Sequence, residues 1–132
     1  MDAGRCLAYW LVEYKGSLPL EIRSLLGGRI FGCDTCTEVC PYHPHSGVTP
    51  DISTQANFLR EYLTFDEKKF HEVFSGTALI RCGYEIFFRN TVTALGCIGN
   101  KEDIAVLENL SHHPLPLVAE HAAWALKQVE KQ

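Results

Sequence analysis

Apolar side chains recur every three to four residues through most of the chain beyond residue 50, a spacing that predicts amphipathic helices. Short turns separate these segments, so each helix can bury its apolar face against the next one. The segments are residues 57–62, a stretch through Phe70 and Phe74, and residues 85–99, 104–114 and 117–130. We expect them to form a HEAT-like α-helical repeat domain, although a plain helical hairpin gives the same pattern.

Polar residues and glycines indicate where these helices begin and end. Thr64 and Glu67 have the T-x-x-E spacing of a capping box, which predicts the first turn of the helix through Phe70. Gly96 and Gly99 predict the end of the helix over residues 85–99.

The first 50 residues have a different pattern. Residues 6–16, CLAYWLVEYKG, are a continuous apolar run that fits either a short buried helix or a strand. Pro19 suits the first turn of a helix, which the glycines at positions 27 and 28 would end. Residues 41–50 contain three prolines and a glycine and therefore predict a linker.

The fold class predicted from these patterns is mainly α, in two parts. Residues 1–47 contain clustered cysteines and are expected to form a cluster-binding segment, whereas residues 48–132 are expected to form the helical domain. With 132 residues, 46% of them apolar and 21% charged, the chain is long enough and apolar enough to bury a core.

Charge and hydropathy exclude some functions. The net charge of −4 does not favour a polyanion, so nucleic-acid binding would require a local basic patch. No stretch approaches the roughly 18 apolar residues of a membrane span, and the N-terminus lacks the layout of a secretory signal. We therefore expect a cytoplasmic protein with no membrane partner.

Six cysteines in a chain without an export signal favour metal binding over disulfides. Cys82 and Cys97 lie alone inside apolar helical patterns, so we interpret them as small buried apolar residues. The four cysteines that remain lie in the first third of the chain, at positions 6, 33, 36 and 40.

Cys33, Cys36 and Cys40 form the motif C-x-x-C-x-x-x-C-P, which matches the end of the bacterial ferredoxin motif C-x2-C-x2-C-x3-C-P. The first position of that motif falls on Ile30, which cannot bind iron, and Cys6 is the remaining clustered thiol. In one interpretation, Cys6, Cys33 and Cys36 bind one [4Fe–4S] cluster, and the cysteine before the proline binds a second one.

Other interpretations stay open at this point. All four cysteines could close a single site, holding either one [4Fe–4S] cluster or zinc. A zinc site of three thiolates and one imidazole could use His43 or His45. A redox dithiol is less favoured, because the βαβ context of a thioredoxin-like site is missing.

The chain resembles the epoxyqueuosine reductase family over nearly its whole length. The resemblance is carried by RC before the apolar run at residue 6, by GRIFGCD-x-C-x-x-x-CP at residues 28–41, and by RN-x-x-x-ALG at residues 89–96. Members of this family are cobalamin-dependent, contain two [4Fe–4S] clusters, and reduce epoxyqueuosine in the wobble position of tRNA to queuosine. The resemblance implies that Cys6, Cys33 and Cys36 are ligands of one cluster and Cys40 is a ligand of the other.

The resemblance also implies what this chain does not contribute. The cobalamin-binding domain, the catalytic acid and the first cysteine motif of the family lie upstream, so we expect a C-terminal portion that contains no catalytic residue and is inactive alone. Its expected partners are the missing N-terminal half, or a separate polypeptide that supplies it, and the tRNA anticodon loop. Arg81, Arg89 and Asn90, in the tail-like segment, are the residues expected to bind RNA. The alternative is a standalone one-site protein, either a small electron carrier or a zinc-stabilised interaction module.

Overall fold

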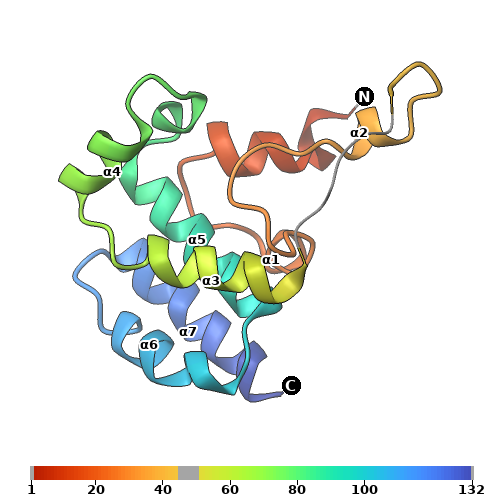
Figure 1. Cartoon of the computed structure of the whole chain (residues 1–132). Helices are drawn as coiled ribbons and strands as arrows, with labels where there is room; N and C mark the ends of the chain where they lie inside the picture. Colours follow the sequence, from red (N-terminus) through yellow and green to blue (C-terminus); the bar gives the residue numbers. More distant parts are fainter. Residues whose placement is uncertain (1, 45–50, 132) are drawn as a thin grey trace.

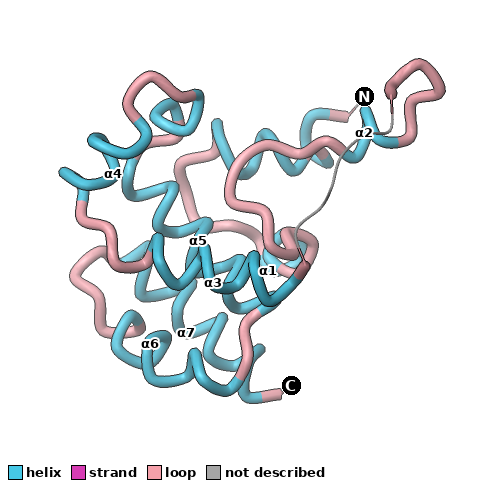
Figure 2. Tube along the Cα trace, in the orientation of Figure 1, coloured by secondary structure: helices cyan, strands magenta, loops and turns pink. Residues whose placement is uncertain are grey.

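The computed structural model describes residues 2–44 and 51–131, which form helices and turns without a strand (Figures 1 and 2). The N-terminal part contains the 3-10 helix η1 (Ala3–Arg5), the π-helix η2 (Tyr9–Glu13), α1 (Leu20–Arg23) and α2 (Thr35–Glu38). The second part contains α3 (Ile52–Tyr62), α4 (Glu67–Phe74), the 3-10 helix η3 (Ala78–Arg81), α5 (Tyr84–Ile98), the 3-10 helix η4 (Lys101–Asp103), α6 (Ile104–Leu110) and α7 (Pro116–Glu130).

Helix α5 lies at the centre of the molecule, and α3, α4, α7, α1 and η2 all pack against it (Figure 1). Every residue from Ile86 to Gly96 is buried. The sequence pattern predicted that one face of this helix is buried, but the structure buries it on several faces. A helix covered on several sides needs no polar face. The predicted pairing of successive helices is present in α6 and α7, which pack against each other.

Helices α5 and α7 approach each other closely at Gly96. A Cβ atom added to Gly96 would lie 2.6 Å from Cβ of Ala125, so only glycine fits at this position. The core around this crossing includes Val92, Leu95 and Val118. Small residues on both helices thus allow the backbones to come close together.

An aromatic cluster joins α4 to the N-terminal half of α5. Phe70, Phe74 and Phe87 contact one another. The ring centroid of Phe70 lies 5.4 Å from that of Phe74 and 5.0 Å from that of Phe87, and the last two are 5.2 Å apart. The third core group belongs to the N-terminal part, where Leu11, Leu18 and Leu26 are buried. This group is small, so the N-terminal part depends on α5 for much of its support.

Two predicted helix features need correction. Helix α4 begins after Asp66, whose carboxylate accepts from the backbone N–H of Lys69 at 2.7 Å. The hydroxyl of Thr64 instead donates to the carbonyl of Glu61, so the predicted Thr64–Glu67 capping box is wrong. The helix after Pro19 is only one turn long and ends well before the glycines at positions 27 and 28.

The predicted boundary between residues 47 and 48 lies outside the described residues, and the structure describes only the first four residues of the predicted linker. Within the two described ranges, none of the helices is both long and apolar enough to span a bilayer.

Candidate iron–sulfur site

Cys6 ends the short helix η1 and is held in place by local hydrogen bonds. Its backbone N–H donates to the carbonyl of Ala3 at 3.2 Å, and its own carbonyl accepts from the N–H of Tyr9 at 3.1 Å. The indole N–H of Trp10 also donates to the carbonyl of Gly4 at 2.9 Å. The backbone on both sides of the cysteine is therefore fixed.

Cys33 lies on the loop that leads into α2, and Cys36 lies within α2 itself. Gly32, with a φ of 66°, turns the chain just before Cys33, and this left-handed conformation favours glycine. Cys33 Sγ lies 3.3 Å from the hydroxyl of Thr35, within hydrogen-bond distance for sulfur. Cys36 lies on the single turn of α2 and is exposed.

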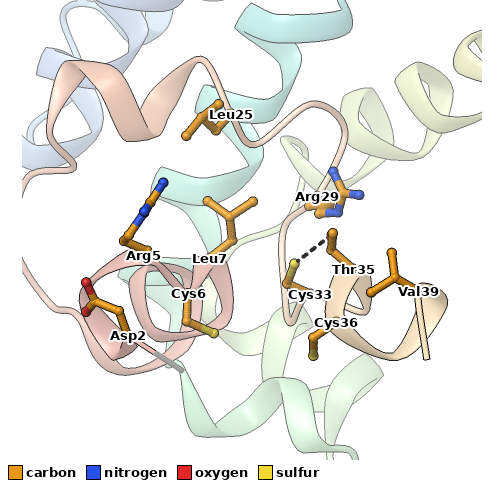
Figure 3. A pocket seen from close by; sticks show the side chains of 10 residues that line it. All are labelled: Asp2, Arg5, Cys6, Leu7, Leu25, Arg29, Cys33, Thr35, Cys36 and Val39. Carbon is orange, nitrogen blue, oxygen red and sulfur yellow. Dashed lines mark hydrogen bonds between the residues drawn. The ribbon is translucent and has the colours of Figure 1, made fainter. Parts of the chain in front are cut away.

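The thiols of Cys6, Cys33 and Cys36 line one pocket of about 570 Å³ (Figure 3). In Figure 3 the Cys6 side chain faces across this pocket toward the segment that bears the other two cysteines. The three thiols lie around a shared cavity and do not converge on a point. Within the described residues, no set of three or more His, Cys, Asp or Glu side chains is grouped closely enough to hold a metal ion.

The wall of this pocket combines apolar and cationic groups. Leu7, Leu25 and Val39 line it, together with the side chains of Arg5 and Arg29 and the carboxylate of Asp2, so two cations face one anion there. Apolar groups limit access of water to a bound cluster, and nearby cations offset the negative charge of thiolate ligands. The type of donor and the character of the wall therefore match the chemistry of an iron–sulfur site, while the thiols stand farther apart than bound ligands do. Arg5 and Arg29 belong to the motifs that carry the family resemblance, whereas no local signal in the sequence identified Leu25 and Val39 as wall residues.

Cys40 does not line the pocket. It follows α2, and its backbone N–H donates to the carbonyl of Thr37 at 3.1 Å. Three of the four predicted ligands therefore line one pocket, and the fourth does not. His43 is exposed and is not part of the pocket wall, and His45 lies outside the described residues.

The other two cysteines are structural. The thiol of Cys82 donates to the carbonyl of Leu79 at 3.1 Å, and that of Cys97 donates to the carbonyl of Arg23 at 3.2 Å. Burial raises the pKa of both thiols, which keeps them protonated at neutral pH.

Arg89 and Asn90 are fully buried, which contradicts their predicted contact with RNA. The Arg89 guanidinium donates to the carbonyls of Trp10, Tyr14 and Gly16 and to the side-chain oxygen of Asn90. Burial lowers the pKa of Arg89 to about 10, so it remains charged at neutral pH. Both side chains are saturated by contacts inside the protein, and we correct their role to a structural one.

Arg81, the third residue predicted to bind RNA, has a different environment. Its side chain is 70% exposed and forms an ion pair with Glu13. Of the three residues predicted to bind RNA, Arg81 is therefore the one whose side chain is exposed.

Comparison with known proteins agrees with this geometry. Residues 1–43 match a family described as a 4Fe-4S double cluster binding domain, which supports the binding of [4Fe–4S] clusters. The epoxyqueuosine reductase of Pseudomonas aeruginosa is 39% identical over 97% of this chain, and that of Escherichia coli is 36% identical over the whole chain. The chain is homologous to part of the epoxyqueuosine reductases.

Solved structures of epoxyqueuosine reductases share the fold as well. The enzyme from Streptococcus thermophilus superposes with a TM-score of 0.82 and 29% identity over the whole of this chain. An epoxyqueuosine reductase crystallised with a tRNA-Tyr epoxyqueuosine-modified tRNA stem loop gives 0.81 and 29% over 98% of the chain. The chain spans only 36 to 37% of the length of these epoxyqueuosine reductases.

Proposed function

We propose that this chain is the iron–sulfur portion of an epoxyqueuosine reductase and takes part in queuosine synthesis. Cys6, Cys33 and Cys36 would hold one [4Fe–4S] cluster, and Cys40 would provide one ligand of a second. When bound, the clusters supply one-electron transfer, in this proposal toward cobalamin. We assign no residue of this chain to cobalamin and expect it to be bound elsewhere in the reductase.

The observation that carries this proposal is the shared pocket. Three thiols from two separate segments line it, and Cys40 does not. This division agrees with the ferredoxin pattern, in which the cysteine before proline serves the other cluster. A single site closed by all four cysteines would require Cys40 to lie with the rest.

Within the pocket, each neighbouring group has a role. The hydrogen bond between Cys33 Sγ and the hydroxyl of Thr35 would tune the reduction potential of a bound cluster. Arg5 and Arg29 would offset its negative charge, and Leu7 would shield it from water.

Serine substitution of single cysteines tests the proposal. The chain is reconstituted anaerobically with iron, sulfide and a small thiol that can supply the fourth ligand, and iron and sulfide are then measured. We expect about four irons per wild-type chain and loss of most of that iron in Cys6→Ser, Cys33→Ser and Cys36→Ser. Cys97→Ser is the matched control, because its thiol is not in the pocket.

Cys40→Ser separates the competing sites. In our proposal it retains the pocket cluster, whereas in a self-contained four-cysteine site it loses iron as fully as the other variants. Uptake of zinc in preference to iron and sulfide by the wild-type chain would instead support the zinc-stabilised module.

We further propose that the helical part contributes to the surface that contacts tRNA, with Arg81 as the remaining candidate residue. Because its side chain is exposed, Arg81→Ala should weaken binding of a tRNA stem loop and lower the slope of log affinity against log salt by about one. Lys101→Ala serves as a charge-matched control. Equal binding by Arg81→Ala and the wild type would remove Arg81 from the proposed surface.

A further inference from the structure

Two segments that are distant in the sequence form the cysteine pocket, and both are attached to the same point on α5. Cys6 precedes η2, whose carbonyls at Trp10 and Leu11 accept hydrogen bonds from α5. Cys33 follows Ile30, whose carbonyl also accepts from α5. We infer that the Arg89–Asn90 pair positions the Cys6 segment relative to the Cys33 segment and so sets the shape of the pocket.

Asn90 is the direct bridge between the two segments. Its single Nδ2 atom donates to the carbonyl of Leu11 at 2.7 Å and to that of Ile30 at 2.9 Å. One amide nitrogen thus fixes the chain five residues after Cys6 and three residues before Cys33. Because the residue is completely buried, water cannot replace either bond.

Arg89 supports this bridge and anchors the chain beyond η2. All five of its N–H donors are used, two of them on the side-chain oxygen of Asn90. These two bonds orient the Asn90 amide so that its NH2 group faces both segments. The other three bonds hold the carbonyls of Trp10, Tyr14 and Gly16.

The bonds also satisfy the end of η2. The last carbonyls of a helix have no partner within it. In η2 they are met by side chains: Trp10 by Arg89, Leu11 by Asn90, and Val12 by the Lys15 ammonium at 2.9 Å. Two of the three contacts at this helix end therefore come from α5, and the third comes from Lys15 just beyond the helix.

The inference rests on the proposed function, because positioning matters only if Cys6 and Cys33 share a cluster. Asn90→Ala is the test variant. The matched control is Thr91→Ala, since Thr91 is equally buried on the same helix but bonds only to the carbonyl of Phe87 within α5. Both changes remove a buried polar group from α5, and Asn90→Ala alone detaches the two segments.

The first measurement uses the cluster-free chain. We expect amide hydrogen exchange to rise in residues 6–15 and 28–36 of Asn90→Ala, and to stay at the wild-type rate there in Thr91→Ala. If Asn90→Ala does not fold cooperatively, Asn90→Ser is used in its place. The serine side chain is too short to bridge the carbonyls of Leu11 and Ile30. Equal exchange in the test and control variants overturns the inference, whether or not the chain binds iron.

The second measurement uses the reconstituted chain at a temperature where both variants are folded. Loss of the contacts that hold metal ligands in position typically lowers the affinity for the metal ten- to a hundred-fold. We expect iron release to a chelator to be about ten-fold faster in Asn90→Ala than in Thr91→Ala, with an altered EPR spectrum of the reduced cluster. Identical release and spectra overturn the inference. A wild-type chain without iron contradicts the proposed function instead, and the exchange measurement then decides the positioning alone.

Discussion

His121 gives this fold a dependence on pH that can be calculated from its contacts. The imidazole is fully buried on α7, where Nδ1 lies 2.7 Å from the carbonyl of Leu117 and Nε2 accepts from the backbone N–H of Leu18 at 3.1 Å. Because a carbonyl only accepts, Nδ1 carries the proton. A second proton on Nε2 would face the N–H of Leu18 and break that bond.

Burial is the main cause that lowers the pKa of His121 to about 4, from an ordinary value of 6.5. The carbonyl of Leu117 and the charge of Glu120 act to raise the pKa, whereas the charges of Arg23 and Arg89 act with burial to lower it. The folded state therefore binds this proton less readily than the unfolded chain does. Stability is complete above about pH 6.5 and is lost as the pH falls toward 4.

The size of the effect follows from linkage. The difference between the folded and unfolded pKa removes about 2 kcal/mol of the free energy of unfolding by about pH 5 and about 3 kcal/mol by about pH 4. His121→Gln removes the titration, so its own stability should lack this component. Carboxylates that also titrate in this range cancel when the variant is subtracted from the wild type.

Urea unfolding of both proteins, followed by circular dichroism from about pH 7 to about pH 4.5, measures this difference. We expect the stability advantage of the wild type to shrink by about 2 kcal/mol by about pH 5. A difference that stays constant within about 0.5 kcal/mol would refute the reasoning. It would mean that the imidazole is protonated as easily when folded as when unfolded.

Three further predictions concern stability and are checked by urea unfolding. Gly96→Ala should cost about 1–3 kcal/mol, because the new methyl group would overlap Ala125, whereas no loss would mean that the helices can separate freely. Asp66→Ala should lower the free energy of unfolding by about 1 kcal/mol, and Thr64→Ala should lower it clearly less. A larger loss in Thr64→Ala than in Asp66→Ala would support the capping box predicted from the sequence. Asp103→Ala should cost about 3 kcal/mol, because its buried carboxylate holds a guanidinium of α3 and caps η4, and a near-neutral result would contradict that role.

The helical segments could be predicted from the sequence because their apolar periodicity is local. The segments predicted at residues 85–99 and 117–130 match α5 and α7 to within about one residue. The short elements could not be predicted in this way. Helix η2 is a single π-helical stretch in an apolar run, and its form depends on side chains that lie more than 70 residues away.

The same distinction explains the outcome at the site. The cysteine spacing is a local signal, and it led to the proposed grouping of Cys6, Cys33 and Cys36, which line one pocket. The burial of Arg89 is not local, because its backbone-carbonyl acceptors are 73 to 79 residues earlier in the chain. An arginine in a helix is usually solvated, so only the tertiary structure reveals that this one is an internal anchor.

These contacts bear on how the two parts of the chain depend on each other. Without α5, carbonyls at Trp10, Leu11 and Ile30 would lose buried donors, and the apolar core of the N-terminal part is too small to offset such a loss. Conversely, without the N-terminal part, the buried charge of Arg89 would lose three of its acceptors. We therefore infer that the two parts fold together, so that the proposed division at residues 47 and 48 would separate functions and not folding units. Cluster binding and the stability of the helical part should consequently be coupled, each strengthening the other.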